Sequence, residues 1–234
     1  MRILLVLLAS FVFGCEKWPG KPVSNVVPAE GSRESFAANY ALHCAACHGP
    51  NGIDGAARPL NDSLYLALTP RANFMEAITH GTGALMPAYA ASEGGPWDSA
   101  ALETFVNSIY SYWGEGKIAG SDAPVYASTA GDPLRGEVAF ASWCGACHGN
   151  DGAGLGEALP SSDAVDGHSI VDPFYLQLVS QQGLRSAVIF GRPSLGMPSY
   201  EGPFPGKGSA RLDETTLSDI TAWLLKRKAT EKNK

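Results

Sequence analysis

The chain has 234 residues, a length that fits one or two domains. Charged residues make up only 17% of it, and the net charge of −6 argues against a nucleic-acid-binding protein, which would show a basic stripe. The 27 glycines and 16 prolines are too few for low-complexity disorder but indicate small, loop-rich domains, and the five cysteines are too few for a disulfide scaffold.

The chain begins with a segment typical of secretion. Arg2 precedes an unbroken apolar run over residues 3–13, which is the arrangement of a signal peptide. As a helix this run would cross only about half of the hydrocarbon core, so it is too short to span a membrane. It ends in Val-Phe-Gly-Cys at residues 12–15, which resembles the lipobox of bacterial lipoproteins, where the signal is cut before the cysteine and the thiol carries diacylglycerol.

This leader accounts for the fifth cysteine. We expect residues 1–14 to be removed and the lipidated Cys15 to become the N-terminus, held at a membrane surface by its acyl chains. Residues 15–31 are rich in proline, glycine and polar residues, and we interpret them as a tether. The alternative is an ordinary signal peptide with an incidental cysteine.

The other four cysteines occur in two copies of one motif. Each copy has the form Cys-x-x-Cys-His, made by Cys44, Cys47 and His48 in the first and by Cys144, Cys147 and His148 in the second. This is the attachment sequence of c-type haem. Residues three apart share a face of a helical turn, so both thiols reach the two vinyl groups of one porphyrin, and the adjacent histidine presents a ring nitrogen to the iron. We therefore predict two covalently bound haem c groups.

Two other cysteine chemistries fit part of this pattern. A thioredoxin-like Cys-x-x-Cys pair needs a βαβ context, and the sequence shows no run of alternating strand pattern. A zinc site built from two such pairs usually spaces them about 15–20 residues apart, whereas these two motifs are much further apart. The haem interpretation also agrees with export, because c-type haem is generally attached on the outer side of the bacterial membrane.

The sequence around the two motifs is repeated. Residues 61–68 align with residues 171–178, and Met-Pro-Ala-Tyr at 86–89 aligns with Met-Pro-Ser-Tyr at 197–200. Each copy predicts a helix, the cysteine motif, a long loop, a helix, a Met-Pro loop and a closing helix. Two copies indicate a duplication rather than a solenoid, which needs at least three repeats.

The repeat defines the predicted domain organisation. We place the two domains at residues 32–113 and 132–229, with a linker rich in glycine, proline and serine at 114–131. The basic tail at 230–234 is either the end of a solvated helix or a contact for anionic lipid or a partner. An aspartate is the expected N-cap of each closing helix, Asp98 in the first domain and Asp213 in the second.

An iron atom held by one histidine needs a sixth ligand or keeps an open face. Of the four methionines, Met1 lies in the leader and Met75 in a helical pattern, which leaves Met86 and Met197, each followed by proline. Proline favours extended backbone in the residue before it, which suits a thioether that reaches in from a loop. Because both repeats carry the same pattern, we predict that Met86 and Met197 are the axial iron ligands opposite the two motif histidines; methionine as a filler of core gaps is the alternative.

Histidine is the rival sixth ligand. His80 aligns with Phe190 in the other copy, and His168 lies in an insert that the first copy lacks, so the repeat supports neither. His43 directly precedes the first motif and is expected to face away from the motif histidine. We interpret all three as surface or loop residues.

Together these features resemble two-domain class I cytochromes c, similar to small dihaem bacterial carriers and to dihaem subunits of some terminal oxidases. The resemblance implies an all-α fold of two tandem cytochrome c domains, each a few helices wrapped around one covalent haem, joined by a flexible linker. In that family a glycine and an aromatic of the first helix pack on the closing helix. Gly136 and Phe140 match this pattern, but Phe36 stands at the glycine position of the first domain, so we expect wider helix packing there.

The same resemblance implies a partner for each haem histidine. In the family a proline carbonyl about a dozen residues further along the chain supports the imidazole. Pro59 and Pro160 occupy that place, and such an acceptor orients the ring.

Two classes of function follow from these predictions. With histidine and methionine on both iron faces, the protein is a membrane-tethered carrier of single electrons in a respiratory chain, and no residue is assigned a catalytic role. Its partners would be a quinol-oxidising complex and a terminal oxidase or reductase, and its location the bacterial cell envelope, facing the periplasm. The alternative is a dihaem enzyme of the peroxidase or thiosulfate-oxidising type with one open or unusually ligated haem. A free carrier and a fixed subunit of a respiratory complex are equally compatible with the sequence.

Overall fold

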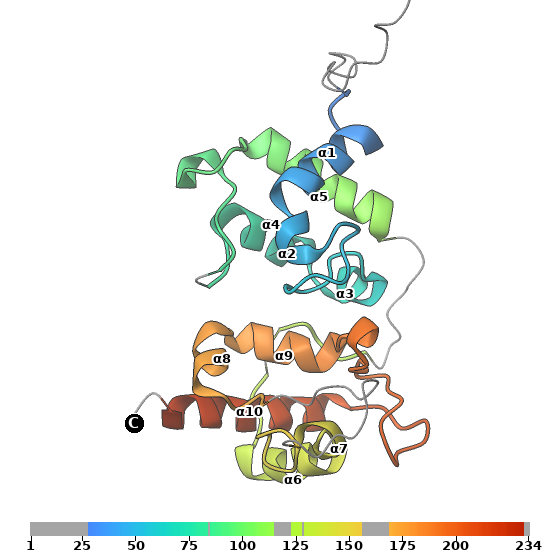
Figure 1. The fold of residues 1–234 in the computed structure, drawn as a ribbon, viewed down its shortest axis with the longest axis vertical. Coiled ribbons are helices and arrows are strands. Elements are labelled where there is room, and N and C mark those ends of the chain that lie inside the picture. Colours follow the sequence, from blue (N-terminus) through green and yellow to red (C-terminus); the bar gives the residue numbers. More distant parts are fainter. Residues whose placement is uncertain (1–27, 84, 115–122, 128, 156–168, 232–234) are drawn as a thin grey trace, which may run out of the picture.

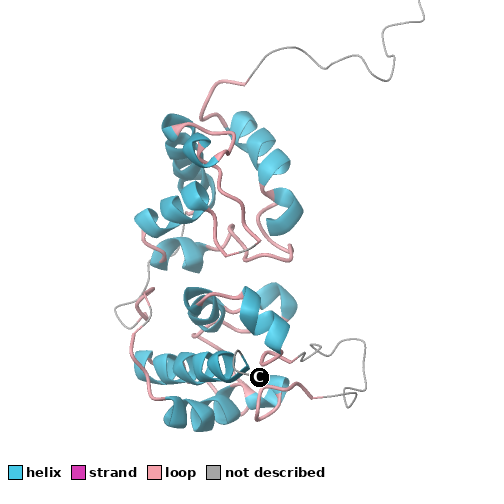
Figure 2. Cartoon of the chain, turned by 90° about the vertical axis from the view of Figure 1, so that its left-hand side faces the viewer, coloured by secondary structure: helices cyan, strands magenta, loops and turns pink. Residues whose placement is uncertain are grey.

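The structure is a computed structural model that describes residues 28–83, 85–114, 123–127, 129–155 and 169–231. In this part of the chain all the regular elements are helices, so the predicted all-α fold is confirmed. The helices form two units, one from each sequence repeat, stacked along the long axis of the molecule (Figures 1 and 2). The predicted leader and Cys15 lie outside the described residues, and none of the described helices has the length and apolar character needed to cross a bilayer.

The helices of the first unit begin at polar caps. They are α1 (Arg33–His43), α2 (Ala45–His48), α3 (Ser63–Leu68), α4 (Arg71–His80), the 3-10 turn η1 (Ala91–Glu93) and α5 (Ser99–Trp113). The side chains of Ser32, Asp62 and Asp98 accept backbone N–H groups at the starts of α1, α3 and α5. Where the sequence predicted one helix before the Met-Pro loop there are two, because Pro70 interrupts the helical hydrogen bonds between α3 and α4.

The second unit repeats this order. It contains α6 (Pro133–Trp143), α7 (Gly145–His148), α8 (Pro173–Leu178), α9 (Gln181–Phe190), the 3-10 turn η3 (Pro193–Leu195) and α10 (Glu214–Glu231). Asp132 and Ser180 cap α6 and α9, and the amide of Thr216 donates to Asp213 at 2.7 Å at the start of α10. Aspartate therefore caps the closing helix in both units, as the sequence predicted.

The two units differ in how the first helix meets the closing helix. In the second unit α6 lies directly against α10, and a Cβ atom at Gly136 would lie 2.0 Å from the carbonyl oxygen of Asp219. In the first unit Phe36 separates α1 from α5, and its ring centroid is 5.4 Å from that of Phe105 and 5.0 Å from that of Trp113. The predicted wider packing of the first unit is confirmed, with aromatic rings filling the space.

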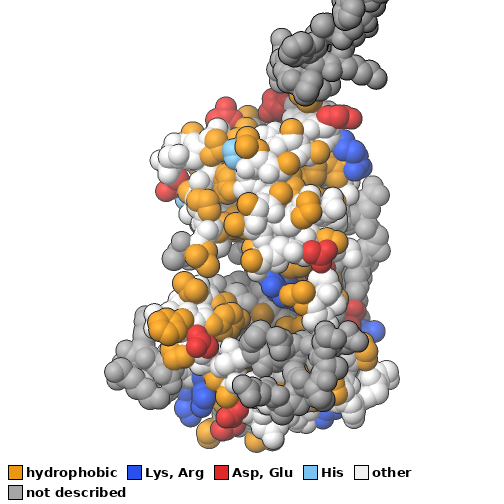
Figure 3. Space-filling model, viewed as in Figure 1, with side chains coloured by type: hydrophobic (Ala, Val, Ile, Leu, Met, Phe, Trp, Pro, Cys, Tyr) orange, Lys and Arg blue, Asp and Glu red, His pale blue; other side chains and the backbone are white. Residues whose placement is uncertain are grey.

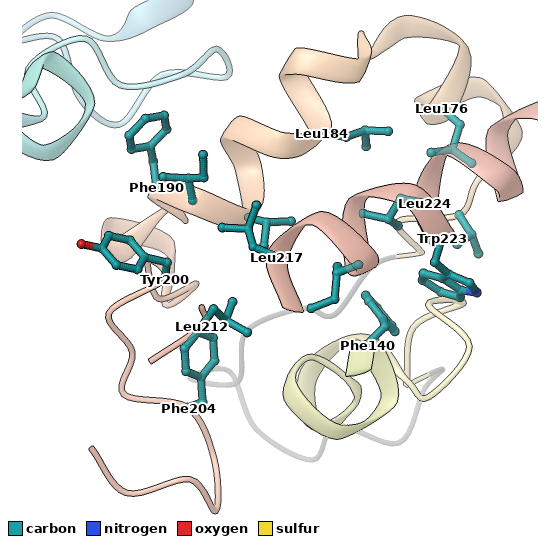
Figure 4. Close-up of a cluster of buried hydrophobic side chains, with 14 of the residues drawn as sticks. Phe140, Leu176, Leu184, Phe190, Tyr200, Phe204, Leu212, Leu217, Trp223 and Leu224 are labelled. Carbon is teal, nitrogen blue, oxygen red and sulfur yellow. The ribbon is translucent and has the colours of Figure 1, made fainter. Parts of the chain in front are cut away.

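The core of the second unit lies between α9 and α10 and reaches α6 (Figure 4). Phe140 of α6 packs on Trp223 of α10 with 4.4 Å between ring centroids. Leu184 of α9 and Leu217 of α10 are 2% and 0% exposed between these helices. This core forms one wall of the site described below.

Part of the predicted linker is bound to the second unit. Arg185 of α9 is fully buried, and its Nη2 donates to the carbonyl of Val125 at 2.6 Å and to Glu214 at 2.8 Å. Its Nε donates to the carbonyl of Tyr126 at 3.2 Å. A buried guanidinium needs several acceptors, and here main-chain carbonyls of the connecting segment supply some of them.

Candidate haem-binding sites

The Cys-x-x-Cys-His motif forms one helical turn in each unit. The amide of His48 donates to the carbonyl of Cys44 at 2.9 Å, and the amide of His148 donates to that of Cys144 at 3.0 Å. The first cysteine and the histidine of each motif are thus joined by a helical hydrogen bond, with the second cysteine on the same turn. Because α2 lies in one unit and α7 in the other, the four thiols do not converge as a shared zinc site requires (Figure 1).

The ring of His48 is oriented for metal binding. Its Nδ1 lies 2.6 Å from the carbonyl oxygen of Arg58, and because a carbonyl only accepts, Nδ1 carries the proton and Nε2 keeps its lone pair. Burial lowers the pKa of His48, as does the positive charge of Arg192, and together they outweigh the opposite effect of the Arg58 hydrogen bond. The ring is therefore neutral at pH 7, as an iron ligand must be.

The carbonyl that supports His48 belongs to Arg58 and not to Pro59, so the predicted acceptor is wrong by one residue. Pro59 is buried directly beside it and favours extended backbone at Arg58. The proline thus restricts the residue whose oxygen orients the ring. Pro160, the corresponding prediction in the second unit, lies outside the described residues.

The two Met-Pro loops have the same backbone construction. Met86 pairs with Thr82, and Met197 pairs with Arg192, in isolated antiparallel bridges just after α4 and α9. A few residues later, the amide of Tyr89 donates to a carbonyl of α4 at 3.0 Å, and the amide of Tyr200 donates to one of α9 at 2.8 Å. The repeated four-residue pattern therefore marks a repeated loop structure.

A glycine at the end of each preceding helix permits this return of the loop. Gly81 and Gly191 both have positive φ, at 74° and 60°. A Cβ atom at Gly81 would lie 2.3 Å from the carbonyl oxygen of Met86, and one at Gly191 would lie 2.5 Å from that of Met197. Any larger residue would push the methionine loop away from its helix.

In the second unit the predicted residues line one cavity. Cys144, Cys147 and His148 face it from one side, and Met197 faces it from the loop after α9. The remaining walls are mostly apolar and aromatic, among them Phe140, Ile170, Leu184, Val188, Phe204, Leu212 and Leu224. Two thiols, an imidazole and a thioether in an apolar cavity fit a covalently attached haem.

In the first unit Cys44 and Met86 pack on one core, whereas Cys47 is exposed. Cys44, Met86 and Tyr89 are half-buried against the same cluster of apolar side chains from α1, α4 and α5. The hydroxyl of Tyr89 donates to the carbonyl of His43 and so joins the methionine loop to the end of α1. This bond holds the methionine loop beside the residue that directly precedes Cys44.

The first thiol of each motif does not have the character of a redox-active cysteine. Burial raises the pKa of Cys44 and of Cys144 to about 12, and the neighbouring Cys47 and Cys147 add to this effect. Catalytic thiols of the thioredoxin type depend instead on a lowered pKa. This argues against the thioredoxin-like alternative.

The rival histidines have other contacts where the structure describes them. The ring of His80 is about half exposed and lies 2.9 Å from a carboxylate oxygen of Glu93 and 3.8 Å from one of Glu76. The ring of His43 lies against Trp97, with 5.0 Å between centroids. His168 lies outside the described residues.

The helical fold and the two Cys-x-x-Cys-His turns define a c-type cytochrome. A family model described as "Cytochrome C oxidase, cbb3-type, subunit III" matches residues 32–106 and 131–224, which is more than half of the chain, so the chain belongs to that family. No curated protein matches it. Membership makes this a haem c protein of electron transfer.

Proposed function

We propose that the protein is a membrane-tethered dihaem cytochrome that passes single electrons along a respiratory chain through two His/Met-ligated haems. The repeated construction of the two sites carries the proposal: both units have the same motif turn and the same type of methionine loop, and in the second unit His148 and Met197 line one cavity. A catalytic haem needs an open or unusual ligand position, and this repetition favours two closed ones.

The chain's residues have defined roles in this proposal. Cys44 and Cys47, and likewise Cys144 and Cys147, would form the thioethers, and each motif histidine and its Met-Pro methionine would occupy the two axial positions. The bound haem supplies reversible one-electron chemistry. The protein excludes water with the apolar walls of the cavity, and methionine ligation raises the reduction potential.

Apolar side chains near both methionines offer a contact for redox partners. Leu85 is 72% exposed directly before Met86, and Leu195 is 55% exposed two residues before Met197. Figure 3 shows hydrophobic side chains spread over the visible face of the upper unit, with few charged groups between them. A partner such as a quinol-oxidising complex or a terminal oxidase would dock there, and the net negative charge favours a basic partner surface.

Substitution of each loop methionine tests whether it is the sixth ligand of a haem iron. Met86→Ala and Met197→Ala should each remove the sulfur-to-iron charge-transfer band of one haem and lower the potential of that haem, because imidazole–thioether ligation favours the reduced iron. The charge-transfer band is measured by near-infrared absorption of the oxidised protein, and the potential of each haem is measured by spectropotentiometric titration. Met75→Ala is the matched control and should leave both haems unchanged. An unchanged band in either loop variant, or a high-spin haem in the native protein, would overturn the proposal in favour of a dihaem enzyme.

The lipid anchor is tested separately. Cys15→Ser should move the protein from the membrane fraction to the soluble periplasmic fraction, because no thiol would remain for acylation. Both haem spectra should persist in this variant. Continued membrane attachment would contradict a lipid anchor at Cys15.

A further inference from the structure

The interface between the two units is built on α3 and α9. Leu64 of α3 is only 5% exposed and belongs to the apolar core of the second unit. The Tyr65 ring meets the Phe190 ring edge-on, with 5.1 Å between centroids. Figure 4 shows Phe190 pointing from the second core toward the pale blue ribbon of the first unit. The two units are therefore packed together, and polar contacts across the interface have a fixed frame.

Arg58 crosses the interface from the first unit. Its Nη2 donates to the carbonyl of Ser186 in α9 at 3.2 Å, and its guanidinium carbon lies 5.2 Å from the centre of the Phe190 ring. The main chain of the same residue serves His48, whose Nδ1 is 2.6 Å from the Arg58 carbonyl oxygen. One residue thus contacts the second unit with its side chain and the histidine of the first unit with its backbone.

Arg192 crosses in the opposite direction. Its Nη2 donates to the carbonyl of Ala56 at 2.6 Å, two residues before Arg58. Its backbone pairs with Met197: the amide of Arg192 donates at 2.8 Å, and the amide of Met197 donates in return at 3.1 Å. Arg192 therefore joins the loop that supports His48 to the loop that presents Met197.

We propose that Arg58 and Arg192 are positioning residues that couple the two haem sites across the domain interface. The inference rests on the proposed function, because it takes His48 and Met197 as iron ligands. Residues 56–58 lie outside any helix. Within the first unit the amide of Ala57 donates to the carbonyl of Cys47 at 2.8 Å, and the two arginine contacts across the interface add to this support. Hydrogen bonds from a guanidinium are stronger than neutral ones, and two of them hold this short loop to the second unit, one donated by Arg58 of the loop and one by Arg192 of the second unit.

The experiment measures the first site after a change in the second unit. Arg192→Gln removes the bond to Ala56, so the Nδ1 proton of His48 should exchange with solvent at least tenfold faster, as measured by NMR on the reduced protein. The potential of the first haem should also fall, because a positive charge beside its loop is lost, by up to about 59 mV for a tenfold change in the oxidised-to-reduced ratio. The Met86 and Met197 variants identify which haem is which.

Three further variants separate positioning from other effects. Arg192→Lys keeps the positive charge and an N–H group for the Ala56 carbonyl. It should therefore show the slow exchange of the native protein and most of its potential. Arg58→Gln should also speed the exchange, and its effect should not add to that of Arg192→Gln, because both act on one loop. Arg71→Gln is the charge-matched control: Arg71 is exposed in the first unit and pairs with Glu103, so it should leave His48 unchanged.

Exchange and potential at the native values in Arg192→Gln would overturn the inference. The inference would also be overturned if Arg192→Gln separated the thermal transitions of the two units but left the Nδ1 exchange of His48 unchanged. The arginines would then only hold the units together. A failure of the proposed function is recognised earlier, as a native protein that lacks two His/Met haem spectra.

Discussion

The two units build their cysteine turns and methionine loops in the same way but are held together internally by different means. In the second unit Gly136 brings two helix backbones into contact, whereas in the first unit Phe36 and its aromatic neighbours fill a wider space. The hydrogen bonds of the cysteine turns and methionine loops are nonetheless matched. Helix contacts can thus diverge after a duplication, while the loops that carry the ligands keep their geometry.

Charge is also distributed differently. Arg185 is fully buried in the second unit and meets Glu214 at 2.8 Å. The ion pair between Arg71 and Glu103 in the first unit has a similar length, 2.7 Å, but both side chains are substantially exposed. The second unit therefore depends on polar contacts around one buried arginine, whose partner Glu214 is 38% exposed, and the first depends on aromatic packing.

The largest effect should come from the aromatic cluster. Phe36→Ala removes a side chain that is 6% exposed and is expected to destabilise the first unit by about 3–5 kcal/mol through lost burial and a cavity. Urea unfolding of the haem-loaded protein measures this. Leu42→Ala, on the same helix and 76% exposed, should cost less than about 0.5 kcal/mol. Equal losses in the two variants would mean that the cluster does not hold α1 in place.

The buried network should come next. Glu214→Gln leaves the guanidinium of Arg185 without its counter-charge and should destabilise the second unit by about 3 kcal/mol. Glu103→Gln breaks the exposed pair of the first unit and should cost less than about 1 kcal/mol. If the two costs are equal in thermal unfolding, burial does not distinguish the two pairs.

The same network predicts a pH dependence. Burial raises the pKa of Glu214, but hydrogen bonds from Thr129, Ser218 and Arg185 outweigh it and hold the pKa below its ordinary value. A lowered pKa stabilises the fold above the unfolded value of about 4.3, and this contribution is lost as pH falls through the folded value. The second unit should therefore lose stability below about pH 4 more steeply in the native protein than in Glu214→Gln. Parallel pH profiles would contradict the assigned network.

Disturbing the close contact between α6 and α10 should have a smaller effect on stability. Gly136→Ala forces a methyl group against the Asp219 carbonyl and should cost about 1–3 kcal/mol. Gly183→Ala in α9 is the milder comparison: its methyl group would meet the side chains of Val179 and the cap residue Ser180 rather than backbone, so it should cost less than Gly136→Ala. Chemical denaturation compares the two, and a neutral Gly136→Ala would show that the helices can separate at little cost.

Loss of a helix cap should have the smallest effect on stability, and the effect should be the same in both units. Asp98→Ala and Asp213→Ala each remove one cap of a closing helix, with hydrogen bonds of 2.9 and 2.7 Å, and each should cost about 1 kcal/mol. Differential scanning calorimetry measures both. A cost confined to one unit would show that the two closing helices are not equivalent.

Features that depend on neighbouring residues could be predicted from the sequence. The motif turns at Cys44 and Cys144, the helix caps and the wider packing at Phe36 all follow from local patterns, since the residues involved lie within a few positions or at matching places in the repeat. Met86 and Met197 could be named because the repeat isolates them, and their role as ligands stays a prediction.

Contacts between distant residues could not be predicted. The resemblance placed the carbonyl that supports His48 at Pro59, one residue too far, because the turn of the intervening loop decides which oxygen faces the ring. Arg185 resembles any helix arginine until the connecting segment supplies carbonyls for it. The apolar run around Tyr65 indicates burial but does not show that part of it packs on the other unit.

The place of Leu64 inside the core of the neighbouring unit has a practical consequence. If the two units were expressed as separate proteins, each would expose to solvent the apolar surface that the other unit covers here. The separate units would then tend to self-associate. Dissection of this cytochrome into one-haem fragments therefore requires a polar replacement at Leu64 in one fragment and at Phe190 in the other.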